Sequence, residues 1–208
     1  MNYTFVTGLH GNEPIPVFAL ANLKVSQYIA NRKALIRNER FIDVDLNKSF
    51  GVKGKGYEYD RAKEILNDIS PEKKVIDLHT FSATSEPFVI VVDKRMIDLA
   101  ITTGLSHIVM MDYNIKNGHA LINYRKGISI EVGQHYSYKS YCVAQSIYRN
   151  IVCNFKPKKK PNLYRVFGII SELGKYINFT RSSQGFYPVL AGEKAYSFYG
   201  LKAKKESL

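Results

Sequence analysis

The chain has 208 residues, 45% of them hydrophobic, which is enough to bury a sizeable core in one main domain of about 150 residues with a small appendage. No apolar run reaches the roughly 18 residues that a transmembrane helix needs, and the first segment lacks the basic start of a signal peptide. We therefore expect a cytoplasmic protein with no membrane partner.

The net charge is +12, from 30 Lys and Arg against 18 Asp and Glu, and this balance favours an anionic substrate or partner. The basic residues are spread along the chain, with local clusters at residues 156–160 and 202–205. Such runs are typical of a solvated linker and tail, so they argue against a nucleic-acid site.

The two cysteines, Cys142 and Cys153, fall in one predicted helix. Eleven residues at 1.5 Å each would separate them by roughly 16 Å, beyond the reach of a disulfide. We expect reduced thiols packed in the core.

The chain opens on an apolar strand that runs into a glycine-flanked turn with His10 and Glu13. Prolines behind the turn favour the start of a helix, whose apolar stripe predicts that it continues through residues 17–30. Open α/β sheets bind their ligands at strand ends of this kind, so the pair predicts a metal site, with zinc as the ion. A hydrolytic zinc takes three protein ligands and keeps one position open, so a third ligand is needed.

A second strand is expected at residues 34–36, followed by the segment 40–50, which is dense in charge yet carries regularly placed apolar residues. A loop that packs down while presenting Arg40, Asn47 and Lys48 is a candidate binding loop. The glycine- and lysine-rich stretch after it lacks the spacing of a phosphate-binding P-loop.

The remaining elements follow from apolar patterns and the turn residues between them. Helices are expected over residues 58–69, 95–103 and 139–154, and strands over 75–80, 88–92, 107–111 and 128–133. After an extended linker at 156–161, short β-rich runs are expected at 164–170, 177–180 and 187–190, with a frayed tail from residue 202.

Two of these strands end in chemically reactive side chains. His79 emerges where its strand stops, and Asp77, two residues earlier on the same side, is placed to hydrogen-bond a ligating imidazole. The alternative is that His79 is no ligand but an ordinary core residue at the end of its strand, with its ring hydrogen-bonded inside the protein. Glu131 lies inside an apolar run, where a carboxylate is costly unless it is paired or used.

Together, these segments resemble the succinylglutamate desuccinylase and aspartoacylase family, relatives of the zinc carboxypeptidases. The motifs that carry the resemblance are Gly8-Leu-His10-Gly-Asn-Glu13, residues 40–50, Asp77-Leu-His79-Thr80 and Ile128-Ser-Ile-Glu131-Val-Gly133, with a weaker match at 187–196. The resemblance implies an α/β fold, with a zinc-carboxypeptidase-like mixed sheet flanked by helices in residues 1–156. A small β-rich C-terminal domain in residues 161–200 would narrow the active-site mouth.

By the same resemblance, His10, Glu13 and His79 would hold one Zn²⁺ ion. Glu131 matches the glutamate that takes a proton from the metal-bound water and passes it to the leaving nitrogen. Arg40 matches the arginine that polarises the scissile carbonyl.

Three further residues match groups that bind the substrate. Asn47 and Lys48 correspond to an Asn-Arg pair that grips the amino acid's carboxylate, and Tyr196 to a tyrosine that reaches in from the C-terminal domain. Lys48 departs from the family pattern, because lysine offers a point charge where arginine offers a fork of two hydrogen bonds. Arg125 is near the position of the arginine that reads a second carboxylate, but its spacing does not match.

The sequence therefore predicts a zinc-dependent amidohydrolase that cleaves the amide bond of an N-acyl amino acid or related acylated amine, with a small anionic acyl amino acid or an acylated peptide as substrate. One alternative is a carboxypeptidase-like metallopeptidase acting on peptides or cell-wall fragments. The other is a catalytically inactive metal- or nucleic-acid-binding protein. Glu131 and Arg40 argue against the inactive form, which has no need of a proton shuttle.

Overall fold

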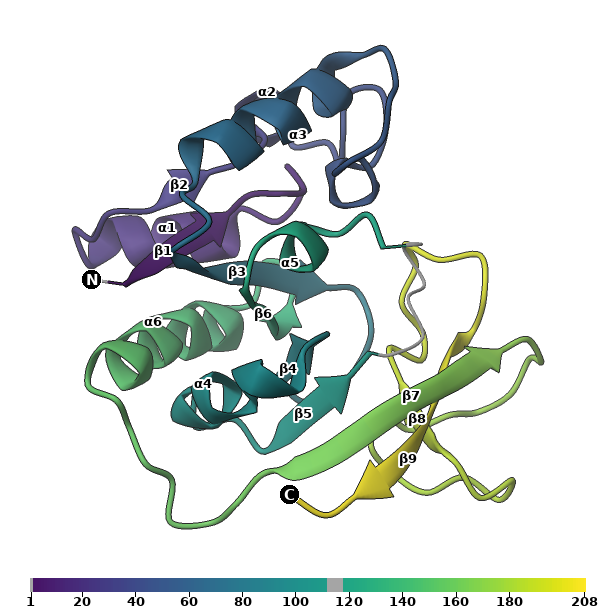
Figure 1. The fold of residues 1–208 in the computed structure, drawn as a ribbon. Helices are drawn as coiled ribbons and strands as arrows, with labels where there is room; N and C mark the ends of the chain where they lie inside the picture. Colours follow the sequence, from purple (N-terminus) through teal and green to yellow (C-terminus); the bar gives the residue numbers. More distant parts are fainter. Residues whose placement is uncertain (1, 112–117) are drawn as a thin grey trace.

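The computed structural model describes residues 2–111 and 118–208, which form an α/β fold around a single mixed sheet (Figure 1). Its strands are β1 Tyr3–Thr7, β2 Tyr28–Ile29, β3 Lys74–Phe81, β4 Phe88–Val91, β5 His107–Met110, β6 Gly127–Gln134, β7 Asn162–Ile170, β8 Tyr187–Val189 and β9 Gly200–Glu206. They pair in the order β2-β1-β3-β6-β4-β5-β7-β9-β8. The first four of these, β2, β1, β3 and β6, run parallel, and β4 pairs antiparallel with β6.

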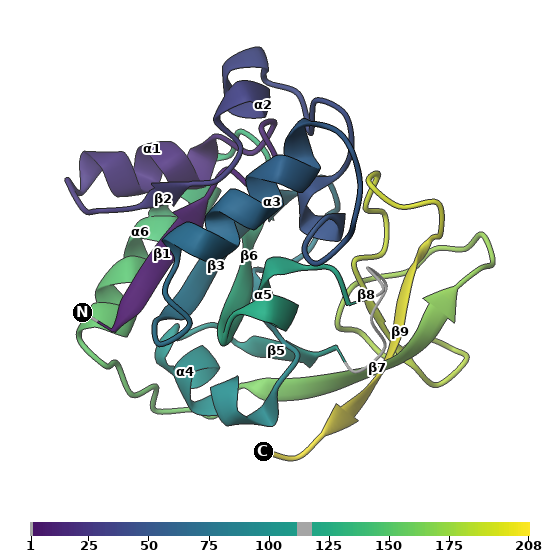
Figure 2. The same cartoon turned by 45° about the horizontal axis from the view of Figure 1, so that its top comes forward.

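The helices cover both faces of the sheet. They are α1 Ile15–Asn22, α2 Arg32–Arg37, α3 Tyr57–Asp68, α4 Ile97–Thr102, α5 Leu121–Tyr124 and α6 Tyr138–Val152, with short 3₁₀ turns η1 Leu46–Lys48 and η2 Lys94–Met96. One buried cluster joins α1, α4 and α6 to one face, and a second joins α3, α5 and the C-terminal strands to the other. In Figure 2, α3 crosses in front of β3, whereas α6 lies behind the sheet.

Because side chains alternate along β3, this strand contributes buried residues to the clusters on both faces of the sheet. Ile76 and Leu78 are buried against the α1, α4 and α6 side, and Val75 is buried on the other side. A strand buried on both faces reads as a continuous apolar run, which is why the sequence predicted β3 to β6 correctly.

The beginning of the chain differs from the prediction in two elements. The first helix ends at Asn22, and the chain then turns back so that β2 pairs with Val6 and Thr7, where one long helix had been expected. Residues 34–36 are helical and not a strand, because the Asn31 side chain accepts the Ala34 backbone N–H and caps α2.

The end of the chain also differs. The predicted frayed tail is β9, which pairs antiparallel with β7 and β8, while the predicted strand at 177–180 lies in turns. The lysines of β9 concealed its pattern, but Leu201 and Ala203 are fully buried in its sheet. β7 pairs with β5, so one sheet continues across the expected domain boundary (Figure 1), and the division into two domains stays a prediction.

Cys142 and Cys153 are free thiols, but the prediction that they pack in the core was wrong, because both are exposed. The buried stripe of α6 is formed by Ala144, Ile147 and Ile151, and Cys142 lies off that stripe. Among the residues that the structure describes, no helix combines the length and apolarity needed to cross a membrane.

Candidate metal centre and active-site cleft

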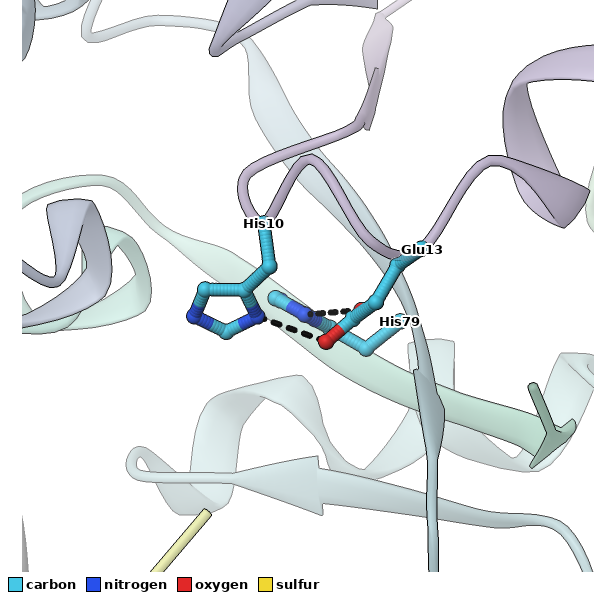
Figure 3. A group of neighbouring side chains, drawn as sticks. All are labelled: His10, Glu13 and His79. Atoms are coloured by element: carbon cyan, nitrogen blue, oxygen red, sulfur yellow. Dashed lines mark hydrogen bonds and ion pairs between the residues drawn. The ribbon is translucent and has the colours of Figure 1, made fainter. Parts of the chain in front are cut away.

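Three buried side chains, His10, Glu13 and His79, converge where β1 and β3 end (Figure 3). Glu13 Oε1 lies 2.7 Å from His10 Nδ1, and Glu13 Oε2 lies 3.0 Å from His79 Nδ1. One ligand atom from each residue falls within 4.8 Å of the others. Two imidazole nitrogens and a carboxylate oxygen form a donor set that suits a catalytic zinc ion, which leaves its fourth position open.

The turn after β1 holds His10 and Glu13 through a close backbone approach at Gly11. A Cβ added at Gly11 would lie 2.0 Å from the Ala34 carbonyl carbon and 2.4 Å from the Glu39 carbonyl oxygen. The Gly11 N–H also donates to the Arg40 carbonyl at 3.2 Å. Only glycine permits this packing of the turn against the segment that carries Arg40.

His79 is fixed from both sides of its ring. Its Nε2 lies 2.7 Å from Asp77 Oδ2, while its Nδ1 faces Glu13. Burial lowers the pKa of His79, but the charges of Asp77 and Glu13 outweigh it and hold the pKa well above its usual value. Burial raises the pKa of Glu13, and the charges of His10 and His79 more than reverse this, so its pKa falls well below the usual range. The hydrogen bond expected between Asp77 and His79 is present.

Asp45 has an equivalent position beside His10, which the sequence analysis missed. Asp45 Oδ1 lies 3.2 Å from His10 Nε2, and Asp45 Oδ2 accepts a hydrogen bond from Arg40 Nη2 at 3.1 Å. Burial lowers the pKa of Arg40, but the neighbouring carboxylates of Asp45 and Glu13 raise it above its ordinary value. The guanidinium is therefore a permanent positive charge next to the candidate metal ligands.

A second residue that the sequence did not reveal is Glu58, which anchors the charged loop (residues 40–50) from α3. Its carboxylate is completely buried. It accepts hydrogen bonds at 2.7 to 3.3 Å from four N–H groups, those of the Asn31 side chain and of the Ile42, Asp43 and Val44 backbone. No sequence signal marks it, because Glu58 resembles an ordinary acidic residue in the first turn of a helix.

These side chains open into a cleft that Glu131, Asn47 and Tyr196 also line. Glu131 comes from β6, where it pairs in register with His79 of β3. Asn47 accepts the Leu121 backbone N–H through its side-chain oxygen at 3.0 Å. The sheet thus places the predicted general base beside a predicted metal ligand.

Tyr196 enters the cleft from the segment between β8 and β9, with its ring stacked on Phe198 at 4.8 Å. Burial, followed by the charge of Glu131, raises the pKa of Tyr196 above its ordinary value. Its hydroxyl therefore stays protonated and can donate a hydrogen bond.

Glu193 connects this C-terminal segment to the end of β3. Its carboxylate accepts the Ser82 backbone N–H at 2.8 Å and the Ser82 hydroxyl at 2.9 Å. Glu193 also lines the cleft.

Two cations considered in the sequence analysis lie elsewhere. The Lys48 side chain is exposed on η1 and is not among the residues that line the cleft. The Arg125 guanidinium donates to backbone carbonyls of Leu66, Ile69 and Tyr124, so it ties α3 to α5 and does not reach the cleft.

Known proteins share both the sequence pattern and this fold. A model of the succinylglutamate desuccinylase/aspartoacylase catalytic domain matches residues 3–145. A probable aspartoacylase from Prochlorococcus marinus subsp. pastoris is 29% identical over 203 residues, which cover 86% of this chain and 63% of the relative. The chain therefore spans less than two thirds of the length of that relative.

Two solved structures superimpose on nearly the whole chain. Succinylglutamate desuccinylase from Chromobacterium violaceum gives a TM-score of 0.73 at 14% identity, with 99% of this chain and 85% of that chain covered. Murine aminoacylase 3 gives a TM-score of 0.72 at 18% identity, with 98% and 95% covered. These similarities confirm the predicted zinc-carboxypeptidase-like α/β fold. Because the family model matches more than half of the chain, the chain belongs to the succinylglutamate desuccinylase/aspartoacylase family.

Proposed function

We propose that the protein is a zinc-dependent amidohydrolase that cleaves the amide bond of an N-acyl amino acid or a related acylated amine. The observation that carries this proposal is the meeting of His10, Glu13 and His79 at one point, with Glu131 on the neighbouring strand. Family membership supports the same reaction class. A cytoplasmic location and a small-molecule substrate are part of the proposal.

His10, Glu13 and His79 would hold the ion. Zinc in such a site makes hydroxide available near neutral pH and acts as a Lewis acid. Asp77 would keep the His79 imidazole in the tautomer that leaves Nδ1 free, because it accepts from Nε2. His10 Nε2 faces both Asp45 Oδ1, at 3.2 Å, and Arg40 Nη2, at 3.0 Å.

Glu131 acts as the proton carrier in this proposal. It removes a proton from the attacking water and then delivers it to the departing nitrogen, which cannot leave as an amide anion. Arg40 is the fixed cation that stabilises the negative charge developing on the carbonyl oxygen. The Tyr196 hydroxyl and the Asn47 amide donate hydrogen bonds that orient the substrate. Lys48, which does not line the cleft, contributes positive charge from outside it.

The test is a panel of N-acyl amino acids, acylated amines and short peptides, assayed with the zinc-loaded protein. Hydrolysis of acylated amines is expected, and Glu131→Gln should retain zinc while turnover falls by at least about a hundredfold. Glu72→Gln, which changes an exposed glutamate, is the matched control and should leave turnover unchanged. Cleavage of peptides alone, next to a free terminal carboxylate, would favour a peptidase. No hydrolysis of any member of the panel would refute the proposal.

A further inference from the structure

The cleft changes chemically from one side of β6 to the other. The candidate metal ligands come from the ends of β1 and β3, on one side of β6 in the strand order. On the other side, β4 and β5 direct Ile90, Val92 and Met111 into the same cleft. These three apolar side chains therefore lie beyond Glu131 as seen from the metal site, whereas Phe81 lines the cleft from the end of β3.

Further apolar groups complete this region, which we call the apolar wall. Its members share an uncharged hydrocarbon surface facing the cleft, and they are Ile90, Val92, Met111, Ala120, Ile122 and Leu190. All are buried except Val92, which is half-buried. The polar residues among them, Asn123 and Ser129, are neutral.

Positive charge is scarce in the cleft. Among the described residues that line it, Arg40 is the one side chain with a permanent positive charge. Its guanidinium already donates to Asp45 at 3.1 Å and lies 3.7 Å from Glu13. Two more carboxylates, Glu131 and Glu193, also line the cleft. Among the described residues, no cation lies beside the hydrocarbon surface against which a second carboxylate of the substrate would be buried, and such burial is strongly unfavourable.

We infer that the apolar wall binds an uncharged, apolar group of the substrate, so that neutral acyl chains are preferred over dicarboxylic acyl groups of the same length. This inference rests on the proposed function, because it assumes that the scissile amide lies at the metal site. It specifies the substrate class as acylated amines whose acyl group is aliphatic or aromatic.

Binding of free acids tests the inference without requiring turnover. Isothermal titration of the zinc-loaded protein would compare monocarboxylates with dicarboxylates of equal carbon number: butanoate with succinate and hexanoate with adipate. Affinity should rise by about threefold to fourfold for each methylene added to the monocarboxylate, the gain expected on transfer from water. Each dicarboxylate should bind at least about tenfold more weakly than its partner.

A substitution in the apolar wall provides a second test of the inference. Val92→Lys would add a cation where the wall is half-buried, and it should shift the preference toward adipate by at least about tenfold. Ile36→Lys is the matched control, because Ile36 is 85% exposed on α2 and far from the cleft lining; it should leave both affinities unchanged. Circular dichroism would establish that both variants fold.

Equal or tighter binding of the dicarboxylates to the unmodified protein would overturn the inference, as would the absence of any gain with chain length. Failure of the proposed function would be seen in the hydrolysis assay and not in the acid titration, because binding of the free acids does not depend on hydrolysis. A protein that prefers hexanoate to adipate but hydrolyses no acylated amine would refute the proposed reaction and leave the apolar wall in place.

Discussion

The His79 imidazole lies between two carboxylates, with its Nε2 2.7 Å from Asp77 Oδ2 and its Nδ1 3.0 Å from Glu13 Oε2. Both carboxylates favour the protonated ring, and its pKa is held well above the usual value despite burial. A metal ion that binds Nδ1 must therefore displace a proton, while Asp77 retains the one on Nε2.

This arrangement predicts that zinc binding depends on pH. The pKa of His79 is raised, so its ring keeps, up to a higher pH than an ordinary imidazole, the proton with which zinc competes. Glu13 contributes little to this effect, because its pKa is lowered and its carboxylate is already ionised. Zinc affinity should rise by about tenfold per pH unit until the raised pKa of His79 is reached, with about one proton released per ion. Calorimetry in buffers of different ionisation enthalpy would measure this release, and pH-independent affinity would contradict it.

Asp45 should tune the metal site through His10. Asp45→Asn keeps the shape of the side chain but removes the carboxylate that faces His10 Nε2 and accepts from Arg40. We expect zinc affinity to fall by about 10- to 100-fold, the range for losing a group that orients a metal-binding histidine. Competition with a chromophoric chelator would measure the affinity. Asp60→Asn, at an exposed side chain of α3, is the control, and equal affinities in the two variants would rule out the role of Asp45.

Glu58 should hold the charged loop in place. Glu58→Ala leaves four N–H groups without their buried acceptor, so we expect the free energy of unfolding to fall by at least about 3 kcal/mol. Urea denaturation would measure this loss. Glu64→Ala on the same helix is the control, because that side chain is largely exposed and its single ion pair with Arg61 contributes little. Similar losses in the two variants would contradict the anchoring role.

Gly11 should tolerate no side chain. Gly11→Ala places a Cβ 2.0 Å from the Ala34 backbone, so the turn carrying His10 must move. We expect a loss of at least about 2 kcal/mol of unfolding free energy, together with weaker zinc binding. Gly168→Ala is the matched control, because a Cβ there meets nothing within 4 Å. Thermal unfolding of both variants would decide the matter, and a Gly11→Ala protein as stable as the control would refute the packing argument.

The sequence predicted the central strands well, because β3 to β6 are short, continuous apolar runs that end in turn residues. It failed where a local cap or a tertiary contact overrides the apolar pattern. A side-chain cap at Asn31 makes residues 34–36 helical, and pairing with β7 orders a lysine-rich segment that resembles a tail. The first outcome depends on a cap that competes with β propensity, and the second depends on a partner strand that is distant in the sequence.

The residues of the candidate site were also predicted only in part. His10, Glu13 and His79 lie at ends of predicted strands, and the structure brings them together, while their role as metal ligands stays a prediction. Asp45 and Glu58 could not be identified, because each is defined by what it contacts and not by its place in a motif. Lys48 stands where the family has an arginine, and its side chain lies outside the cleft.

The strand order also has a consequence for folding kinetics. His10 precedes β3, and β6 is separated from β3 by β4 and β5, so these segments must cross long stretches of chain before they pair. Contacts of such high sequence separation are costly to close and form slowly. We predict that the candidate metal pocket is completed late in folding, because these pairings must be in place before His10, Glu13 and His79 meet. Zinc should therefore lengthen the lifetime of the native state by slowing its unfolding, while the refolding rate in stopped-flow experiments stays nearly the same.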